Sequence, residues 1–282
     1  MSMRIGKNKE KSKHLKFFKK IMSSLLKFSL FFFLLIFNVS NSFSAEKQEK
    51  LLKQSWSFDG FFGKFDRASL QRGYQVYTEV CASCHSMNLL SYRNLSEVGG
   101  PSFSEEEVKA IASKVEVLDG PNDSGEMFKR PGKPSDKFAS PFANEKAARS
   151  ANGGAYPPDM SVLVKARAGG PDYIYSILMG YTDKPPKDVK LEDGVYYNKY
   201  MPGNKIKMSK PLSQDSVKYS DGTTATEEQL SKDVVTFLTW ASEPHLEARK
   251  RIGFKTVVYL LILTVLVYLV KKKIWLRVEP KV

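Results

Sequence analysis

Cys81-Ala82-Ser83-Cys84-His85 contains both cysteines of this 282-residue chain and one of its three histidines. Two thiols at this spacing can each add across a vinyl group of the same haem, and the adjacent imidazole is then carried beneath the iron. The stretch therefore predicts haem c that is covalently attached through Cys81 and Cys84. His85 is the predicted proximal ligand of the iron.

Two other kinds of site use cysteines at this spacing, a structural zinc site and a thioredoxin-like redox pair. Structural zinc requires four ligands. The chain has no further cysteine, and of its other histidines His14 lies in a segment that we expect to be removed and His245 lies close to a predicted membrane helix. A redox pair is expected near a βαβ pattern, whereas residues 67–77 have helical periodicity. We therefore favour the haem site.

The N-terminal segment is first basic and then strongly apolar. Lysines recur from Lys7 to Lys20, and the apolar run 28–39 follows them. This run is short for a membrane span, and Ser42-Phe43-Ser44 offers small residues to a signal peptidase. Residues 1–44 are therefore predicted to be a cleaved secretory signal peptide. The alternative is an uncleaved N-terminal anchor, because the basic region is long and the cleavage signal is based on serine.

The C-terminal segment contains a second apolar run, residues 256–270, with basic residues on both sides. A helix that begins near Ile252, with Lys255 reaching to the surface, spans roughly 30 Å at about 1.5 Å per residue. Residues 249–273 are therefore predicted to be a transmembrane anchor rather than a buried core helix, since the flanking lysines and Trp275 are typical of a membrane interface.

Because basic residues flank this helix on both sides, the positive-inside rule says little about its orientation. The predicted signal peptide decides it instead. Residues 45–248 are expected on the periplasmic side of a bacterial inner membrane, and residues 274–282 in the cytoplasm. A simple signal of the Sec type favours a bacterial source over a mitochondrial one.

The formal net charge of +14 is concentrated at the two ends of the chain. Residues 1–44 and residues 249–282 each carry nine Lys or Arg and one Glu, a net charge of +8, so residues 45–248 carry −2. A basic chain often binds nucleic acid or anionic lipid. Here the basic residues belong to targeting and membrane-flanking segments, so we expect no nucleic-acid partner, and the lipid bilayer is the expected surface.

Most of residues 45–248 are predicted to be helices joined by long loops. Turn-forming glycines and prolines recur between Gly99 and Gly222, and few stretches alternate as strands do. Helices are predicted over residues 67–80, over 104–116 with a Ser104–Glu107 capping box, from Pro171 through Met179, and from Thr226 to Pro244. The fold class is therefore mainly α, and a large planar cofactor could fill the centre that the loops surround.

A helix before the haem motif and another near the end of the domain are typical of class I c-type cytochromes, which this chain resembles. In that family the two helices cross closely, and Gly73 with Tyr77 is similar to the pattern at the crossing. The resemblance becomes specific to the cytochrome c1 family in eight ordered motifs between about Ser55 and Trp275. They are Gly73-Tyr74-Gln75-Val76-Tyr77, Cys81-Ala82-Ser83-Cys84-His85-Ser86-Met87, Asp119-Gly120-Pro121-Asn122, Gly125-Glu126-Met127-Phe128, Arg130-Pro131-Gly132-Lys133, Ala147-Ala148-Arg149, Pro157-Pro158-Asp159 and Met201-Pro202-Gly203.

A haem iron in an electron carrier needs a sixth ligand, and a methionine thioether stabilises the ferrous state. Spacing alone does not choose among the candidates Met87, Met127, Met160, Met179, Met201 and Met208. The resemblance implies Met208. It also implies that Arg167 pairs with a haem propionate, where a guanidinium suits a carboxylate, and that Asn152, Pro158 and Tyr173 line the haem pocket.

The resemblance implies the haem subunit of the cytochrome bc1 complex, a quinol:cytochrome c reductase. The subunit itself would be an electron carrier, taking electrons from the Rieske iron–sulfur protein and passing them to cytochrome c, with cytochrome b as a further partner. The acidic stretches 105–107, 116–119 and 192–193 could steer a basic acceptor. The alternatives are another anchored monohaem cytochrome, such as an oxidase subunit, and a haem enzyme or sensor with an open sixth position.

Overall fold

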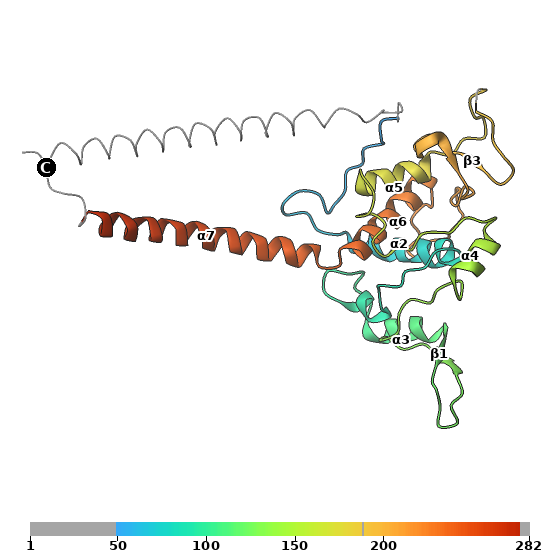
Figure 1. The fold of residues 1–282 in the computed structure, drawn as a ribbon, viewed down its shortest axis with the longest axis horizontal. Helices are drawn as coiled ribbons and strands as arrows, with labels where there is room; N and C mark the ends of the chain where they lie inside the picture. Colours follow the sequence, from blue (N-terminus) through green and yellow to red (C-terminus); the bar gives the residue numbers. More distant parts are fainter. Residues whose placement is uncertain (1–48, 188, 277–282) are drawn as a thin grey trace, which may run out of the picture. The chain divides into compact units, whose positions relative to one another are not determined.

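The computed structural model describes residues 49–187 and 189–276, and the predicted signal peptide 1–44 lies outside these ranges. The described part is mainly helical, as predicted (Figure 1). Its α-helices are α2 (Arg67–Glu79), α3 (Glu105–Ser113), α4 (Glu145–Ala151), α5 (Gly170–Met179), α6 (Glu227–Ser242) and α7 (Leu246–Trp275). Its 3₁₀-helices are η2 (Cys81–Ser83), η3 (Tyr92–Ser96) and η4 (Pro202–Asn204).

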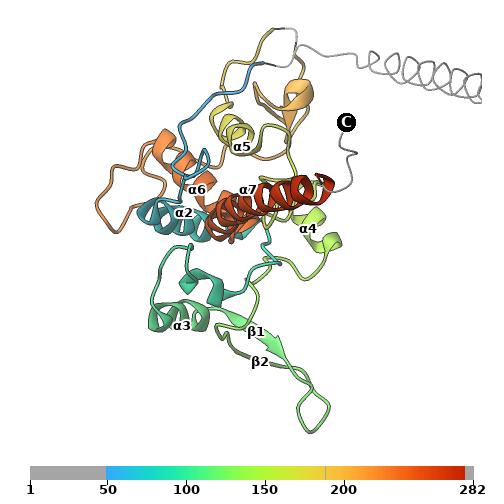
Figure 2. The same cartoon turned by 90° about the vertical axis from the view of Figure 1, so that its left-hand side faces the viewer.

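The core forms where α2 and α6 cross, and α5 packs on α6 (Figures 1 and 2). A Cβ atom added at Gly73 would lie only 2.1 Å from the carbonyl oxygen of Asp233 and 2.7 Å from the Cβ of Phe237. The aromatic rings of Tyr74 and Tyr77 lie 5.6 and 5.7 Å from the ring of Phe237. The close crossing of the two helices at Gly73 is therefore confirmed.

The predicted helix starts agree with the structure, because their signals are local. Ser104 caps α3 in a capping box with Glu107, and Thr226 caps α6 by accepting from the backbone of Gln229. Two helix ends differ. α3 ends at Ser113 rather than near residue 116, and α6 ends at Ser242.

Two short antiparallel ladders were not predicted. β1 (Glu116–Asp119) pairs with β2 (Phe128–Pro131), and β3 (Tyr196–Tyr197) pairs with β4 (Lys205–Ile206). β1 begins at Glu116, which was expected to be the last residue of the preceding helix. All four strands are exposed or half-buried, so they carry little of the apolar alternation that marks a strand in sequence.

α7 is the one helix among the described residues that is long and apolar enough to cross a membrane, with a mean hydropathy of 2.2 over its most apolar stretch. It begins at Leu246, earlier than the predicted start near Ile252, and Leu246 itself is buried in the domain. From Ile252 onward its side chains are exposed. The helix therefore starts as part of the domain core and continues as a membrane anchor.

Candidate functional site

The predicted haem motif follows directly after α2. Cys81 begins η2, and the backbone N–H groups of Cys84 and His85 both donate to the carbonyl of Cys81, at 3.1 and 2.9 Å. This tight turn keeps the three residues together at the end of the helix. Both cysteines are free thiols and partly buried, so the structure contains no disulfide between them.

Burial raises the pKa of the Cys81 thiol to about 12, and the neighbouring Cys84 adds to the rise. Catalytic redox cysteines act as thiolates, which a lowered pKa favours. The described residues also contain no group of three or more His, Cys, Asp or Glu side chains placed to hold a metal ion. These observations weigh against the redox and zinc alternatives.

His85 is held in one orientation by a backbone carbonyl. Its Nδ1 lies 2.8 Å from the carbonyl oxygen of Pro158, and because that oxygen can only accept, Nδ1 is the protonated nitrogen. Burial lowers the pKa of the imidazole, although Pro158 and Asp159 oppose this effect. The ring is therefore neutral near pH 7, with a free lone pair on Nε2. A histidine that binds a metal through one ring nitrogen typically donates the N–H of its other ring nitrogen to an acceptor such as a backbone carbonyl.

The segment that carries Pro158 is docked onto the residues after His85. The carboxylate of Asp159 accepts from Ser86 Oγ at 2.8 Å and from the N–H of Asn88 at 2.9 Å. Met160 N–H donates to the carbonyl of Ser86 at 2.8 Å. These bonds fix the carbonyl of Pro158, and hence the plane of the His85 ring.

Met208 lies in a loop that hydrogen bonds tie to two other segments of the chain. The hydroxyl of Tyr181 donates to the Met208 carbonyl at 3.0 Å. Lys207 Nζ donates to the carbonyl of Gly153 at 3.0 Å, next to Asn152. The structure thus brings the loop of Met208 to the loop before Pro158, in which Asn152 ends α4 and donates to the carbonyl of Ala148 at 2.7 Å.

Tyr173 lies on α5, and its hydroxyl donates to the sulfur of Met201 at 3.7 Å. Arg167 is exposed and close enough to Tyr173 to lower its pKa, although burial raises that pKa overall. In this structure the Arg167 guanidinium donates to the carbonyl of Ala166 at 3.2 Å. The predictions for Arg167, Asn152, Pro158, Tyr173 and Met208 as haem contacts therefore remain predictions.

Sequence reasoning missed two residues that tie the loop of Met208 to other segments, Tyr181 and Lys207. Met201 was a candidate for the sixth iron ligand and part of a family motif, but its contact with Tyr173 was not predicted. Tyr181 and Lys207 act through contacts between segments far apart in the chain, which no local pattern reveals.

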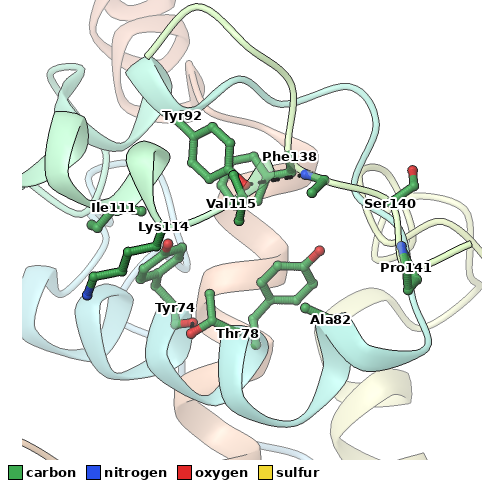
Figure 3. Close-up of a pocket in the computed structure, with 12 residues that line it drawn as sticks. Tyr74, Thr78, Ala82, Tyr92, Ile111, Lys114, Val115, Phe138, Ser140 and Pro141 are labelled. Atoms are coloured by element: carbon green, nitrogen blue, oxygen red, sulfur yellow. Dashed lines mark hydrogen bonds between the residues drawn. The ribbon is translucent and has the colours of Figure 1, made fainter. Parts of the chain in front are cut away.

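A separate cavity of about 400 Å³ lies between α2 and the segments that carry η3 and α3 (Figure 3). It touches the haem motif through Ala82 and includes none of the other predicted haem contacts. Lys114 lies among the aromatic side chains around it. The lining consists of Tyr74, Tyr77, Thr78, Ala82, Tyr92, Ile111, Lys114, Val115, Phe138, Ala139, Ser140 and Pro141.

The donor set at the haem motif fits a c-type haem. It combines two free thiols, a neutral imidazole with an available Nε2, and a methionine on a loop linked to the segment that orients the imidazole. The helices that precede and follow the long loops, α2 and α6, cross each other. Together with this site, they define a c-type cytochrome with a C-terminal membrane anchor.

Comparison with known sequences gives the family. The sequence model of the cytochrome c1 family matches residues 56–278, so the chain belongs to that family, as the motifs predicted. It is 52% identical over 82% of its length to "Cytochrome b/c1" of Bradyrhizobium diazoefficiens, where the match covers 36% of that protein. It thus spans only about a third of that relative.

Two further relatives are covered more fully. The chain is 52% identical to "Cytochrome c1 1, heme protein, mitochondrial" of Arabidopsis thaliana over 77% of this chain and 69% of the relative. It is 47% identical to "Cytochrome c1" of Rhodospirillum rubrum over 81% of this chain and 89% of the relative. The agreement therefore extends over most of the chain and is not confined to the haem motif.

Proposed function

We propose that this chain is the membrane-anchored haem subunit of a quinol:cytochrome c reductase and that it transfers single electrons from a Rieske iron–sulfur protein to cytochrome c. The observation that carries the proposal is the hydrogen bond from His85 to Pro158, made beside two free thiols in a chain of the cytochrome c1 family. Bound haem c supplies a one-electron iron couple.

The residues of the chain have distinct roles in this function. Cys81 and Cys84 would hold haem c covalently, and Pro158 holds the His85 ring so that Nε2 would be the ligand atom. Met208 would supply the second protein ligand of the iron. Arg167, whose guanidinium is exposed, would pair with a propionate, and Asn152 and Tyr173 would line the pocket.

The subunit changes no substrate itself. Quinol oxidation belongs to the whole complex, in which cytochrome b and the Rieske protein are the partners of this chain. Its haem domain, residues 45–248, lies on the periplasmic side of a bacterial inner membrane, with residues 249–273 of α7 as anchor and residues 274–282 in the cytoplasm. Cleavage of residues 1–44 is part of this proposal, and N-terminal sequencing of the mature protein tests it.

The first test is affinity purification of the full chain from detergent-solubilised membranes, followed by a reduced-minus-oxidised spectrum and identification of the co-purified subunits. We expect a c-type band together with b-type haem and an iron–sulfur protein. A c-type band alone would favour a free-standing anchored cytochrome, and the absence of haem would contradict the proposal.

The assignment of Met208 as an iron ligand is tested by two matched substitutions. Met208→Leu removes the thioether from the iron, so the haem potential should fall until ascorbate no longer reduces it, and carbon monoxide should bind the reduced protein. Met201→Leu removes a thioether that is bonded to Tyr173 instead and should leave both properties unchanged. If instead the Met201→Leu protein binds carbon monoxide and the Met208→Leu protein keeps a low-spin haem spectrum, the ligand is Met201 and not Met208.

A further inference from the structure

Residues 57–64 form a loop, here called the Phe61–Phe62 loop, that presents two phenylalanines to the surface. Phe61 is 54% exposed and Phe62 is 75% exposed. Isolated apolar side chains on a surface need no explanation, whereas a contiguous exposed apolar patch marks an interaction site.

The backbone does hold them there, because the base of the loop is part of the core. Trp56, Phe58 and Phe65 are buried, and the N–H of Lys64 donates to the carbonyl of Ser57 at 3.0 Å. The tip therefore cannot fold back to bury its own phenylalanines without removing other aromatic rings from the core.

The loop is also bound to the first turns of α7. Lys250 Nζ donates to the carbonyls of Phe58 and Gly60, each at 2.6 Å. One turn earlier, the carboxylate of Glu247 accepts from the N–H of Phe65 at 2.9 Å and pairs with Arg67 at 2.8 Å. The start of the anchor and the Phe61–Phe62 loop are thus one packed unit.

Phe254 continues the same face of α7. Glu247, Lys250 and Phe254 follow one another at intervals of three and four residues, so they lie along one side of the helix. The ring centroid of Phe254 lies 6.0 Å from that of Phe61 and 6.0 Å from that of Phe62, and the two loop rings are 5.0 Å apart. We call these three residues the phenylalanine cluster.

The position of Phe254 sets the depth of the phenylalanine cluster. It lies two residues before Thr256, where the uncharged run of α7 begins, a distance of roughly 3 Å along the helix axis. Aromatic rings at this level lie at the boundary between headgroups and acyl chains. Since Phe61 and Phe62 contact Phe254, they lie at the same level.

We propose that the Phe61–Phe62 loop is a second membrane contact of this protein, inserted into the headgroup–acyl boundary of the lipid bilayer beside α7. The apolar surface of the phenylalanine cluster is continuous with that of the membrane helix. Arg251 and Lys255, both exposed on α7 close to Phe254, suit the phosphate groups of the same boundary. The proposal rests on the anchoring of α7 and not on the electron transfer proposed above.

Such a contact would restrict the tilt of the haem domain on the membrane. A single helix allows a range of tilts, whereas a loop fixed to the helix by Glu247 and Lys250 provides a second point of attachment on one side. The same surface of the haem domain would then face the membrane at all times.

The test is photocrosslinking of the full-length protein in its own membrane, with p-benzoylphenylalanine incorporated in place of Phe62 and, in a control, in place of Phe128. Phe128 is also an exposed phenylalanine, 42% accessible, but lies on the β1–β2 hairpin, which projects away from α7 in both views (Figures 1 and 2). After irradiation, the adducts are identified by mass spectrometry.

We expect phospholipid adducts at position 62 at least tenfold above those at position 128, with an unchanged haem spectrum in both variants. An adduct with another polypeptide at position 62 would make the phenylalanine cluster a protein interface and overturn the proposal. Lipid labelling no higher at 62 than at 128 would overturn it as well. Neither result would alter the haem band or the co-purified subunits, so failure here is distinguishable from failure of the proposed function.

Discussion

Asp233 is the fully buried carboxylate at the crossing of α2 and α6. It accepts from Ser69 Oγ at 2.6 Å, from Arg72 Nε at 2.8 Å and from Gln229 Nε2 at 2.9 Å. A buried charge is tolerated only when such partners compensate for the loss of water. Arg72 depends on the same contacts, since burial opposes its charge while Asp233 and Asp221 raise its pKa.

Asp233→Asn should therefore destabilise the domain by about 3 kcal/mol, because it leaves the partly buried Arg72 without its main counter-charge. The matched control is Asp221→Asn, which removes a half-exposed partner of the same guanidinium at 3.0 Å and should cost less than about 1 kcal/mol. The midpoints of urea unfolding, followed by far-UV circular dichroism in detergent, measure both values. If both variants lose the same free energy of unfolding, Asp233 contributes no more than Asp221 to the stability of the crossing.

At the scale of elements, the α2–α6 crossing depends on the missing side chain of Gly73. Alanine would favour the helix by about 1 kcal/mol, yet its Cβ would lie 2.1 Å from a backbone oxygen of α6. Backbone cannot move aside as a flexible side chain can, so the two helices must separate. Overpacking of this kind costs about 1–3 kcal/mol.

Gly73→Ala is therefore expected to lower the free energy of unfolding of the domain by about 2 kcal/mol. Gly253→Ala, in α7, places a Cβ where no atom lies within 4 Å and should cause no loss. The comparison uses the same urea titration. A Gly73→Ala variant as stable as the parent chain would show that the helices adjust at no cost.

The β1–β2 hairpin is held at its base by an ion pair that gives it a defined response to pH. Arg130, on β2, donates to the carboxylate of Asp136 at 2.6 and 3.0 Å, and also bonds Asp119. Arg130, followed by the N–H of Lys133, lowers the pKa of Asp136 to about 2. The carboxylate therefore stays charged in the folded chain at a pH at which it would be protonated in the unfolded chain.

A carboxyl group with a lowered folded pKa contributes stability that is complete above its unfolded pKa of about 4 and is lost as the pH falls toward about 2. Amide hydrogen exchange in residues 116–131 should thus accelerate between pH 4 and pH 2, relative to exchange in α6. Asp136→Asn should accelerate exchange at pH 6 and remove this dependence. Hairpin exchange in Asp136→Asn that still rises steeply below pH 4 would assign the effect to another group.

The elements show why part of this structure was predictable. Ser104 with Glu107 and Thr226 with Gln229 cap their helices within one turn, and the haem motif is complete within five residues. α4 was missed although Asn144 caps it by accepting from the N–H of Ala147, because the helix has only seven residues.

The candidate site was predictable only where its chemistry is local. Cys81, Cys84 and His85 are predicted by spacing alone, whereas the choice of Met208 depends on the family resemblance, because six methionines fit the spacing equally well. The assignment of Met208 therefore stays a prediction. The carbonyl of Pro158 and the side chains of Tyr181 and Lys207 act across the fold. Backbone carbonyls leave no mark in a sequence, so the group that orients His85 could not have been derived from spacing.

At the scale of the whole molecule, the structure reduces the set of acidic residues available to steer a basic acceptor. Glu116 is paired with Lys129 at 3.0 Å and Asp119 with Arg130, so their charges are largely compensated. Glu105 and Glu106 are exposed in the first turn of α3, where the helix dipole favours negative charge.

These two carboxylates give the final prediction. Residues 45–248 carry a net charge of only −2, so any attraction for a basic cytochrome c must come from local clusters that act within a Debye length, about 30 Å at 0.01 M salt and about 10 Å at 0.1 M. The rate of cytochrome c reduction by the assembled complex should therefore fall as salt is added. Neutralising Glu105 and Glu106 with Glu105→Gln and Glu106→Gln should lower the rate about threefold at low salt and flatten its salt dependence.

Glu116→Gln is the control, since its charge is already paired with Lys129 and its removal should leave the salt dependence unchanged. Stopped-flow kinetics over a series of ionic strengths provides the measurement. If the Glu105/Glu106 variant and the parent chain show the same slope, the first turn of α3 is a solvated helix face and the acceptor approaches elsewhere, because a charge that guides encounter must lose its effect when salt screens it.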